Sequence, residues 1–200
     1  MKRALNHFKR VDKKLFDTAK NMDIETLKPR KPKDYFKSIC REIIGQQLAG
    51  KVARVIFERF TELFPGKKIT AQRILEFPEQ KLRDVGMAWS KVRAIKDLAQ
   101  KTEDKTLMFR KMESMTNEQV VEMLTKVKGI GPWTADMFLM FTLGREDIFS
   151  DKDLGLKKAI IKLYGLDEKV TDRELKEISR KWSPYRTYAC LALWKLKDGD

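Results

Sequence analysis

The stretch that decides the fold reads Leu124-Thr125-Lys126-Val127-Lys128-Gly129-Ile130-Gly131-Pro132-Trp133-Thr134-Ala135. Apolar residues at helical spacing precede the Gly-Ile-Gly sequence and a strongly apolar run follows it, which predicts two helices joined by a tight turn. Gly129 and Gly131 permit a positive φ and leave their amides uncovered by side chains. Pro132 suits the first turn of the second helix, where a missing N–H costs nothing. Backbone donors placed in this way at a helix N-terminus are suited to bind a phosphate oxygen.

The helical period continues on both sides of this stretch, and we therefore predict an all-α protein. Apolar residues recur at spacings of three and four in the segments 36–44, 52–60, 92–99, 120–127, 156–163 and 175–182. The segments 135–143 and 188–196 are apolar around most of the helix circumference, which is typical of central helices. Capping sequences predict helix starts at Thr116-Asn117-Glu118-Gln119 and Thr171-Asp172-Arg173-Glu174. The basic, Pro-interrupted stretch 28–33 predicts a connector.

The charge balance points to a polyanionic partner. Lys and Arg number 43 against 29 Asp and Glu, which gives a net charge of +14. This excess favours nucleic acid over an anionic membrane or a merely basic surface. The sequence has neither an apolar run of the ~20 residues that a membrane span needs nor a secretion signal at its start. We expect a monomer, with no membrane partner, in the cytoplasm at the nucleoid or in the nucleus.

Cysteine and histidine usage excludes several kinds of chemistry. Cys40 and Cys190 stand among apolar neighbours and are expected to be buried, reduced thiols. Two thiols are too few for an all-cysteine iron–sulfur cluster. Zinc chemistry and a histidine-based nucleophilic relay lack residues, because His7 is the single histidine. We therefore expect no required cofactor, and a carboxylate or a lysine must carry any catalysis.

A second informative segment follows the hairpin and its apolar helix. It reads Asp147-Ile148-Phe149-Ser150-Asp151-Lys152-Asp153-Leu154. A hairpin, a buried helix, a loop and an aspartate that opens the next helix together resemble the helix-hairpin-helix DNA glycosylase superfamily, and most of all 3-methyladenine DNA glycosylase II. The resemblance also rests on Ile44-Gly45-Gln46-Gln47, on Leu82-Arg83-Asp84-Val85-Gly86-Met87 and on Trp182 to Ala189. It covers about residues 35–196.

The resemblance implies a single glycosylase domain of two helical lobes with a DNA-binding cleft between them. One lobe would span about 38–143, with the hairpin at 120–143, and the other 1–37 plus 144–200. The implied partner is double-stranded DNA with damaged bases, and the implied function is to flip out and hydrolytically excise alkylated purines of the 3-methyladenine and 7-methylguanine type, leaving an abasic site. The alternatives are a glycosylase for oxidised or mismatched bases and a non-catalytic DNA-binding module. Longer relatives carry a further mixed α/β domain, which this chain is expected to lack.

The resemblance places the catalytic carboxylate on Asp153, with Asp151 as its competitor. Either aspartate would also cap the helix that carries Leu156, and the two roles are compatible. A fixed anion stabilises the oxocarbenium character that develops on the sugar when an N-glycosidic bond breaks, and it can orient or deprotonate the attacking water. A base alkylated at N3 or N7 is cationic and leaves as a neutral species. Many family members have proline where Ser150 or Asp151 stands, so the geometry of this loop is open.

Further site residues follow from the same resemblance. Trp133, Trp194 and Met137 are candidates for the base pocket, with a place in the core as the alternative for Trp194 and Met137. The wedge that fills the gap left by the flipped nucleotide matches Gln47 and Leu48, or these form a turn without DNA contact. Trp89, Lys91 and Arg93 are weaker candidates for the opposite strand. The DNA backbone would be bound by Lys126, Lys128, Gly129, Ile130, Gly131 and Thr134, and the main-chain carbonyls of Thr125, Val127 and Ile130 would hold a structural Na⁺ or K⁺ ion.

The hairpin also bears on how the reaction ends. Family members that cleave the abasic strand carry a lysine directly before the residue pair that Thr134-Ala135 matches, and its amine forms a Schiff base. Trp133 occupies this position here, and an indole is no nucleophile. We therefore expect a monofunctional enzyme that uses water, and we interpret Lys152 as a solvated or phosphate-facing charge.

Overall fold

The computed structural model describes residues 1–24 and 26–198, and this part of the chain contains helices and no strand. The all-α prediction is confirmed. Both predicted helix starts are confirmed, and both are capping boxes: the hydroxyls of Thr116 and Thr171 accept the N–H groups of Gln119 and Glu174, whose side chains accept in return. The helices, including three short 3-10 segments, are α1 (Lys2–Val11), α2 (Lys13–Ala19), η1 (Pro32–Asp34), α3 (Tyr35–Gly45), α4 (Gly50–Glu62), η2 (Pro65–Lys67), α5 (Ala71–Glu76), α6 (Glu79–Asp84), α7 (Trp89–Glu103), η3 (Phe109–Ser114), α8 (Asn117–Thr125), α9 (Pro132–Phe141), α10 (Leu154–Tyr164), α11 (Asp172–Arg180) and α12 (Arg186–Asp198).

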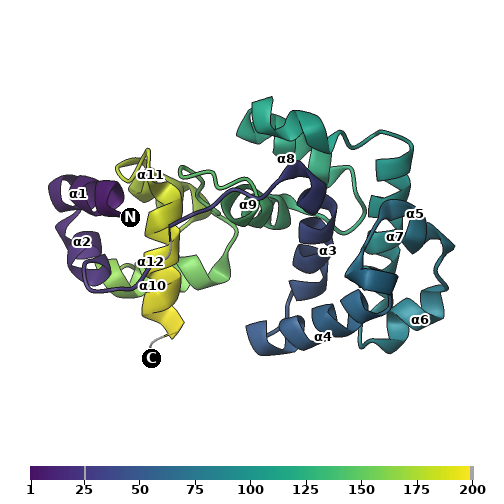
Figure 1. Cartoon of the computed structure of the whole chain (residues 1–200). Helices are drawn as coiled ribbons and strands as arrows, with labels where there is room; N and C mark the ends of the chain where they lie inside the picture. The colour runs from purple at the N-terminus through teal and green to yellow at the C-terminus, as the bar shows by residue number, and fades with distance from the viewer. Residues whose placement is uncertain (25, 199–200) are drawn as a thin grey trace. The chain divides into compact units, whose positions relative to one another are not determined.

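The chain divides into two compact units. Unit 1 comprises Met1–Pro29 and Gly144–Asp200, and unit 2 comprises Arg30–Leu143. Helices α1, α2 and α10 to α12 therefore belong to unit 1, and α3 to α9 belong to unit 2 (Figure 1). In the described residues, no helix is long and apolar enough to cross a membrane.

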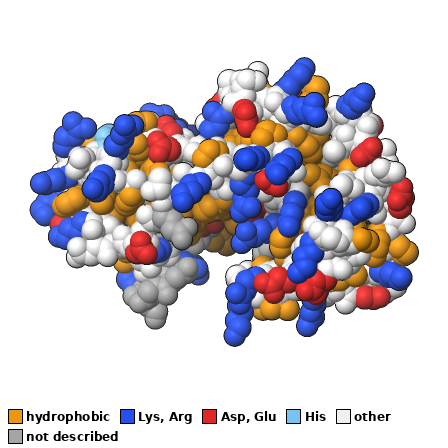
Figure 2. Space-filling view, in the orientation of Figure 1, with side chains coloured by type: hydrophobic (Ala, Val, Ile, Leu, Met, Phe, Trp, Pro, Cys, Tyr) orange, Lys and Arg blue, Asp and Glu red, His pale blue; other side chains and the backbone are white. Residues whose placement is uncertain are grey.

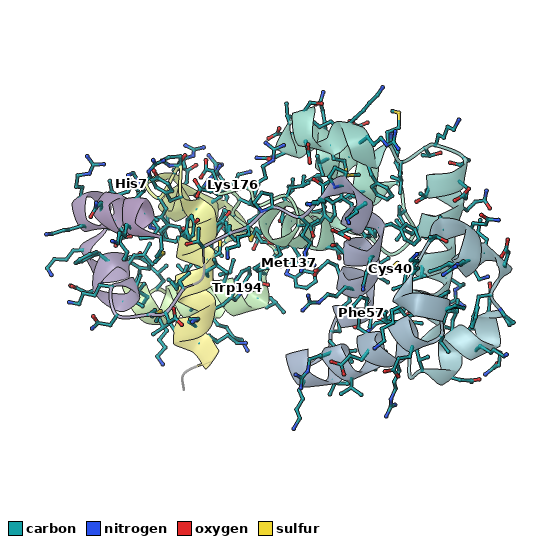
Figure 3. The ribbon with its side chains drawn as sticks, viewed as in Figure 1. His7, Cys40, Phe57, Met137, Lys176 and Trp194 are labelled. Carbon is teal, nitrogen blue, oxygen red and sulfur yellow. The ribbon has the colours of Figure 1, made fainter. Side chains whose placement is uncertain are left out.

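Unit 2 is built around α3, which packs against α4, α7 and α9. Its inner face is formed by fully buried residues, among them Ile39, Cys40 and Ile43. Helix α5 packs against α7, and α8 packs against α9. The predicted burial of the Cys40 thiol is confirmed, and Figure 3 shows this residue on α3. Burying apolar surface at ~25 cal/mol per Å² is the main source of stability for such a helical layer.

Unit 1 centres on α12, which packs against α10 and α2. Cys190 is buried on α12, as predicted. A buried carboxylate, Asp12, ties the N-terminal helices to the rest of the unit. It caps α2 by accepting the Leu15 N–H at 3.1 Å, and it also accepts the indole N–H of Trp182 at 2.8 Å and the Tyr164 hydroxyl. Such a carboxylate is tolerated inside the unit because donors surround it.

Candidate functional site

The predicted hairpin forms between α8 and α9, and its two glycines differ in conformation. Gly129 has a φ of +79°, and a Cβ atom there would lie 3.2 Å from Cβ of Ala94. Gly131 has a φ of −100° and a ψ of 178°, which any residue adopts, and a Cβ atom there would meet no atom within 4 Å. Only Gly129 therefore uses the conformational freedom for which both glycines were suited. Pro132 is the first residue of α9, as predicted.

Two side chains from neighbouring helices hold this hairpin. The Gln46 amide, at the end of α3, donates through Nε2 to Gly129 O at 2.9 Å and to Thr134 Oγ1 at 2.9 Å. The Asp97 carboxylate on α7 accepts the Lys128 main-chain N–H at 2.8 Å and also contacts Lys101 Nζ at 2.9 Å. Burial alone would raise the pKa of Asp97, but these donors outweigh it and the pKa is lowered. The turn is thus fixed from both sides before any ligand binds.

The side chains assigned to DNA-backbone contact have different exposures. Lys126 and Lys128 are exposed at the turn. The side chains of Ile130 and Thr134 are buried, and the Thr134 hydroxyl accepts the Gln46 amide. Any contact of Thr134 with a phosphate would therefore use its main-chain N–H, whereas the Ile130 N–H already donates to Val127 O at 3.1 Å.

Of the three carbonyls proposed for a monovalent cation, that of Thr125 is at the C-terminal end of α8, and those of Val127 and Ile130 belong to the turn that follows. Carbonyl groups in the last turn of a helix lack intrahelical donors and lie at the negative end of the helix dipole. Thr125 is the last residue of α8, and the Val127 carbonyl accepts the Ile130 N–H at 3.1 Å, which uses one of its two lone pairs. Neutral carbonyl oxygens are the kind of ligand that a Na⁺ or K⁺ ion would take, and the ion itself stays a prediction.

The wedge candidates occupy a tight turn between α3 and α4. The Leu48 N–H donates to Gly45 O at 3.2 Å, and Gln46 at the first central position has φ −52° and ψ 130°. Gln47 follows with a φ of +56° and an exposed side chain. These angles define a type II turn, whose second central position favours glycine. A glutamine in this left-handed conformation is strained, and such strain clusters at functional positions.

The three weaker candidates for opposite-strand contact at the start of α7 differ from one another. Trp89 is 41% exposed and Arg93 is exposed. Lys91 instead donates its ammonium group to the carbonyls of Ile44 at 2.8 Å and Gln46 at 2.9 Å. Burial lowers the pKa of Lys91. Its charge caps the C-terminal end of α3, so the structure gives it a role inside unit 2.

Asp153 in unit 1 is the N-cap of α10. Its Oδ1 accepts the Leu156 N–H at 2.7 Å and the Trp194 indole N–H at 3.1 Å. The first bond comes from α10 itself and the second from α12, so the two donors orient the plane of the carboxylate. Asp153 is half-buried. Of the two competing aspartates, it is the one that caps the helix.

A glycine allows the indole of Trp194 to approach Asp153. A Cβ atom on Gly155 would lie 3.0 Å from Asp153 Oδ1 and 3.6 Å from Trp194 Cδ1. The first of these distances is tighter than nine in ten real Cβ contacts, so a larger residue at position 155 would require the Asp153 carboxylate to move by a few tenths of an ångström. Trp194 is half-buried on α12 (Figure 3). The structure therefore places the Trp194 indole in contact with the Asp153 carboxylate, on the apolar helix α12.

The loop that leads to Asp153 is held by the start of α12. Arg186 donates from Nε to Asp147 Oδ1 at 2.7 Å and from Nη2 to Asp147 Oδ2 at 3.0 Å. The buried Thr187 hydroxyl donates to Arg145 O at 2.7 Å and accepts the Ile148 N–H at 3.0 Å. Burial would raise the pKa of Asp147, but the hydrogen bonds from Arg186 and Ser183 lower it. The stretch 182–189 thus acts as a clamp on residues 145–148.

The lysine nearest to the carboxylate in sequence is paired with an acid. Lys152 Nζ lies 2.6 Å from Asp172 Oδ2, the first residue of α11. The hydrogen bond from this carboxylate raises the pKa of Lys152. A lysine that acts as a nucleophile needs a lowered pKa. This pairing therefore agrees with the interpretation of Lys152 as a solvated charge.

The remaining pocket candidates belong to unit 2. Trp133 is the second residue of α9 and is half-buried, whereas Met137 on the same helix is buried (Figure 3). Asp153 and Trp194 belong to unit 1, so the pocket between these two pairs stays a prediction. Lys and Arg side chains are spread over the visible surface of each unit (Figure 2), in agreement with the excess of basic residues.

Sequence reasoning gave no role to several residues that shape the site. Gln46, Arg186 and Thr187 stood in motifs of the resemblance, but their partners lie 83, 39 and 42 residues away in the chain. Asp97 and Gly155 belonged to none of the motifs on which the resemblance rests. The sequence signal for Gly155 was its place in the first turn of a helix, two residues after a candidate catalytic aspartate.

Comparison with known proteins identifies the family. Residues 40–184 match the model of the HhH-GPD superfamily base excision DNA repair proteins. The chain is 32% identical over 216 residues to a DNA-3-methyladenine glycosylase from Saccharomyces cerevisiae, with 98% of this chain and 71% of that protein covered. A Bacillus subtilis relative is 35% identical over 166 residues, and these cover 80% of this chain and 58% of that protein.

A solved structure extends the likeness to the fold. The Schizosaccharomyces pombe 3-methyladenine DNA glycosylase, in complex with abasic DNA, superimposes with a TM-score of 0.86 and 28% identity. The match covers 96% of this chain and 95% of that one. The hairpin and the capped aspartate described above lie within residues 40–184, which match the family model. The chain therefore belongs to the HhH-GPD superfamily of base excision DNA repair proteins.

Proposed function

We propose that this protein is a monofunctional 3-methyladenine DNA glycosylase that excises alkylated purines from double-stranded DNA. The observation that carries the proposal is the Asp153 carboxylate, oriented at the N-terminus of α10 by Leu156 N–H and the Trp194 indole. The names of its relatives support the substrate class. The name of the Saccharomyces cerevisiae relative gives 3-methyladenine as the base it acts on, and the aligned region reaches 98% of this chain.

The proposed reaction begins with extrusion of the damaged nucleotide, because the glycosidic bond is out of reach inside the duplex. The bond between C1′ and the base nitrogen then breaks, and its electron pair leaves with the alkylated base, which becomes neutral. Positive character on the sugar is stabilised by the Asp153 carboxylate. A water molecule adds to C1′ and loses a proton, which yields the abasic site and the free base. Asp153 orients this water or accepts its proton.

The other parts of the site have supporting roles in the proposal. Gln47, strained at a φ of +56°, and its neighbour Leu48 fill the space that the flipped nucleotide leaves. The hairpin 126–134 holds the DNA backbone through main-chain N–H groups, with Lys126 and Lys128 adding charge. Trp133 and Trp194 stack on the damaged base, whose positive charge adds a cation–π attraction of about 0.5–2 kcal/mol. Thr125, Val127 and Ile130 would hold a Na⁺ or K⁺ ion through their carbonyls and stiffen the turn.

The test is to incubate the protein with methylated duplex DNA and to identify the released bases by mass spectrometry. We expect 3-methyladenine and 7-methylguanine in the supernatant. Parallel reactions with duplexes that contain an oxidised or a mismatched base test the rival substrate classes. Release from those substrates alone would replace the alkylated-base assignment, and binding without release of any base would favour a non-catalytic DNA-binding module.

The end of the reaction provides a second test. With Trp133 at the position of the Schiff-base lysine, borohydride added during turnover should trap no protein–DNA adduct, and the strand should stay intact until alkali or heat is applied. A strong adduct would overturn the monofunctional assignment. The ion pair with Asp172 makes Lys152 a poor nucleophile, so an adduct would have to be mapped by peptide mass spectrometry.

A further inference from the structure

One side chain in unit 2 joins the turn that carries Gln47 to the hairpin. The Gln46 amide donates to Gly129 O and to Thr134 Oγ1, each at 2.9 Å. Gly129 lies in the Gly-Ile-Gly turn and Thr134 in the first turn of α9. A carbonyl oxygen can only accept, so the contact with Gly129 fixes which end of the amide faces the hairpin. One amide group therefore spans the distance between the two elements.

The main chain of Gln46 is held from another direction. Lys91 on α7 donates its ammonium group to Ile44 O and Gln46 O, at 2.8 Å and 2.9 Å. Hydrogen bonds to a charged donor are roughly twice as strong as those between neutral groups. Gln46 is thus anchored through its carbonyl to α7 and through its side chain to the hairpin. It cannot shift without breaking one of these contacts.

Gln47 depends on this anchoring. Gln46 and Gln47 are the two central residues of one type II turn, and Gln47 has the strained φ of +56°. A strained conformation persists only where the surrounding structure enforces it. The hairpin can enforce the strained conformation of Gln47 through Gln46, because the Gln46 backbone forms the first half of the turn and its side chain contacts the hairpin. Losing the Gln46 amide would let the turn relax while the hairpin keeps its own contact with Asp97.

We infer that Gln46 is a positioning residue that couples the hairpin's hold on the DNA backbone to insertion of the Gln47 side chain into the duplex. This inference rests on the proposed function, because it assigns Gln46 to the opening of the base pair. The Gln46 amide sets the spacing between the held phosphate and the inserted wedge. Its loss slows the extrusion of the nucleotide and leaves bond cleavage at Asp153 unchanged. We expect this slower extrusion to reduce base release only from substrates whose damaged base is well paired.

The experiment compares Gln46→Met, which keeps the length of the side chain and loses both donors, on two DNA substrates. One carries 7-methylguanine paired with cytosine, and the other carries it in a single-nucleotide bulge, where unpairing costs little. Under single-turnover conditions we expect about tenfold slower release from the paired substrate, the effect of losing one to two hydrogen bonds. Release from the bulge should stay within about twofold. Equal slowing on both substrates, or no slowing on either, would overturn the inference.

Two further variants serve as controls: one removes a glutamine elsewhere in unit 2, and the other weakens the same contact without changing Gln46. Gln72→Met removes an exposed glutamine on α5 whose amide contacts Glu76 at 3.1 Å, and it should leave both rates unchanged. Thr134→Val removes one of the two Gln46 acceptors and leaves the 45–48 turn untouched. It should slow the paired substrate in the same selective way, by a smaller factor. If Gln46→Met proves poorly folded, selective slowing by Thr134→Val supports the coupling and its absence refutes it.

A readout without base release separates this inference from the proposed function. A duplex with an abasic-site analogue and 2-aminopurine as its neighbour should gain fluorescence when the wedge enters and unstacks the reporter. We expect Gln46→Met to bind this duplex within a few-fold of the unmodified protein and to lose most of the gain. If the unmodified protein released no alkylated base but this difference remained, the proposed function would fail and the coupling would stand. An unchanged gain would refute the coupling.

Discussion

The hairpin in unit 2 and the 145–153 loop in unit 1 both hold candidate functional groups in a fixed geometry. They differ in whether those groups are main-chain atoms or a side chain. In the hairpin the groups proposed to bind DNA are main-chain atoms, and the side chains of Gln46 and Asp97, from α3 and α7, hold the backbone in place. In the loop the group proposed to act in catalysis is a side chain, Asp153, and the hydrogen bonds that hold the preceding backbone come from α12. The hairpin should therefore tolerate most side-chain changes at its tip, whereas the loop depends on one particular carboxylate.

The largest expected effect tests the loop. Asp153→Asn keeps a side chain that caps a helix well and removes the negative charge. We expect base release to fall by about two to three orders of magnitude, as when a single electrostatic stabiliser is lost. Binding to an abasic-site analogue should stay within a few-fold, because the carboxylate acts on charge that develops in the transition state. Single-turnover release and a binding titration measure the two quantities.

Asp151→Asn is the matched control, because Asp151 lies in the same loop and does not cap α10. It should retain most of the activity. The opposite ranking of the two variants would move the catalytic assignment to Asp151.

The next effect concerns the clamp on the loop and depends on pH. Arg186 and Ser183 lower the pKa of Asp147 in the folded protein. A lowered folded-state pKa contributes stability above the unfolded-state pKa of about 4, and this contribution is lost as the pH falls through the folded-state value. Asp147→Asn should lower the free energy of unfolding by about 1–2 kcal/mol near neutral pH. Urea unfolding should show the two proteins converging as the pH falls below about 4.

Asp17→Asn provides the comparison for an exposed pair. Hydrogen bonds from Lys13 and Lys20 lower the pKa of Asp17 to about 2, but this carboxylate is exposed on α2. Solvent screening makes such pairs weak. If Asp17→Asn lowered the free energy of unfolding as much as Asp147→Asn, the contacts of Asp147 with Arg186 and Ser183 would stabilise the fold no more than an exposed ion pair does.

A smaller effect separates the two glycines of the hairpin. Gly129→Ala places a side chain at a φ of +79° and should lower the free energy of unfolding by about 1–2 kcal/mol. Gly131→Ala, in an extended conformation with open space around it, should change it by less than about 0.5 kcal/mol. Both variants should bind DNA of every sequence more weakly, since a methyl group covers the amides. Unchanged binding by Gly131→Ala would remove its N–H from the phosphate contact.

The smallest effect concerns the hairpin lysines. Each phosphate contact that Lys126 or Lys128 makes should contribute about 0.9 to the slope of log K against log[salt]. Lys128→Ala should reduce this slope by about one and weaken binding to all sequences alike. Lys13→Ala, whose ammonium pairs with Asp17 on α2, should leave the slope unchanged. A slope that is already flat in the unmodified protein would contradict the interpretation of its basic charge.

Local features of the fold were predictable, and long-range pairings were not. The capping boxes at Thr116 and Thr171 and the proline at the start of α9 are decided by residues three or four apart, so the sequence shows them directly. The bonds from Gln46 to Gly129 and from Trp182 to Asp12 join residues 83 and 170 positions apart. The hydrophobic periodicity of the sequence cannot predict such hydrogen-bond partners, because the pairing depends on how whole helices pack against one another. The short helices α5 and α6 were also missed, since six residues hold too few turns to show a period.

The site was predictable to a similar degree. A candidate carboxylate and a candidate wedge came from motifs, but the reason that each keeps its geometry came from the structure. The strain at Gln47 and the crowding at Gly155 are properties of backbone angles and neighbouring atoms. The lysine at position 91 shows the limit most clearly: its charge suggested a DNA contact, and it turned out to cap α3.

The two points at which the chain passes between the units carry a consequence for its architecture. Arg30 N–H donates to Thr142 O at 2.8 Å, so a backbone hydrogen bond joins the first residue of unit 2 to the last residue but one. Within unit 1, Gly144 approaches Pro29 so closely that a Cβ atom would lie 3.0 Å from the Pro29 nitrogen. Unit 2 is therefore an insertion whose two ends meet, and the host sequence on either side of it meets as well. A topology of this kind lets one unit be inserted in another while the host helices keep their own core.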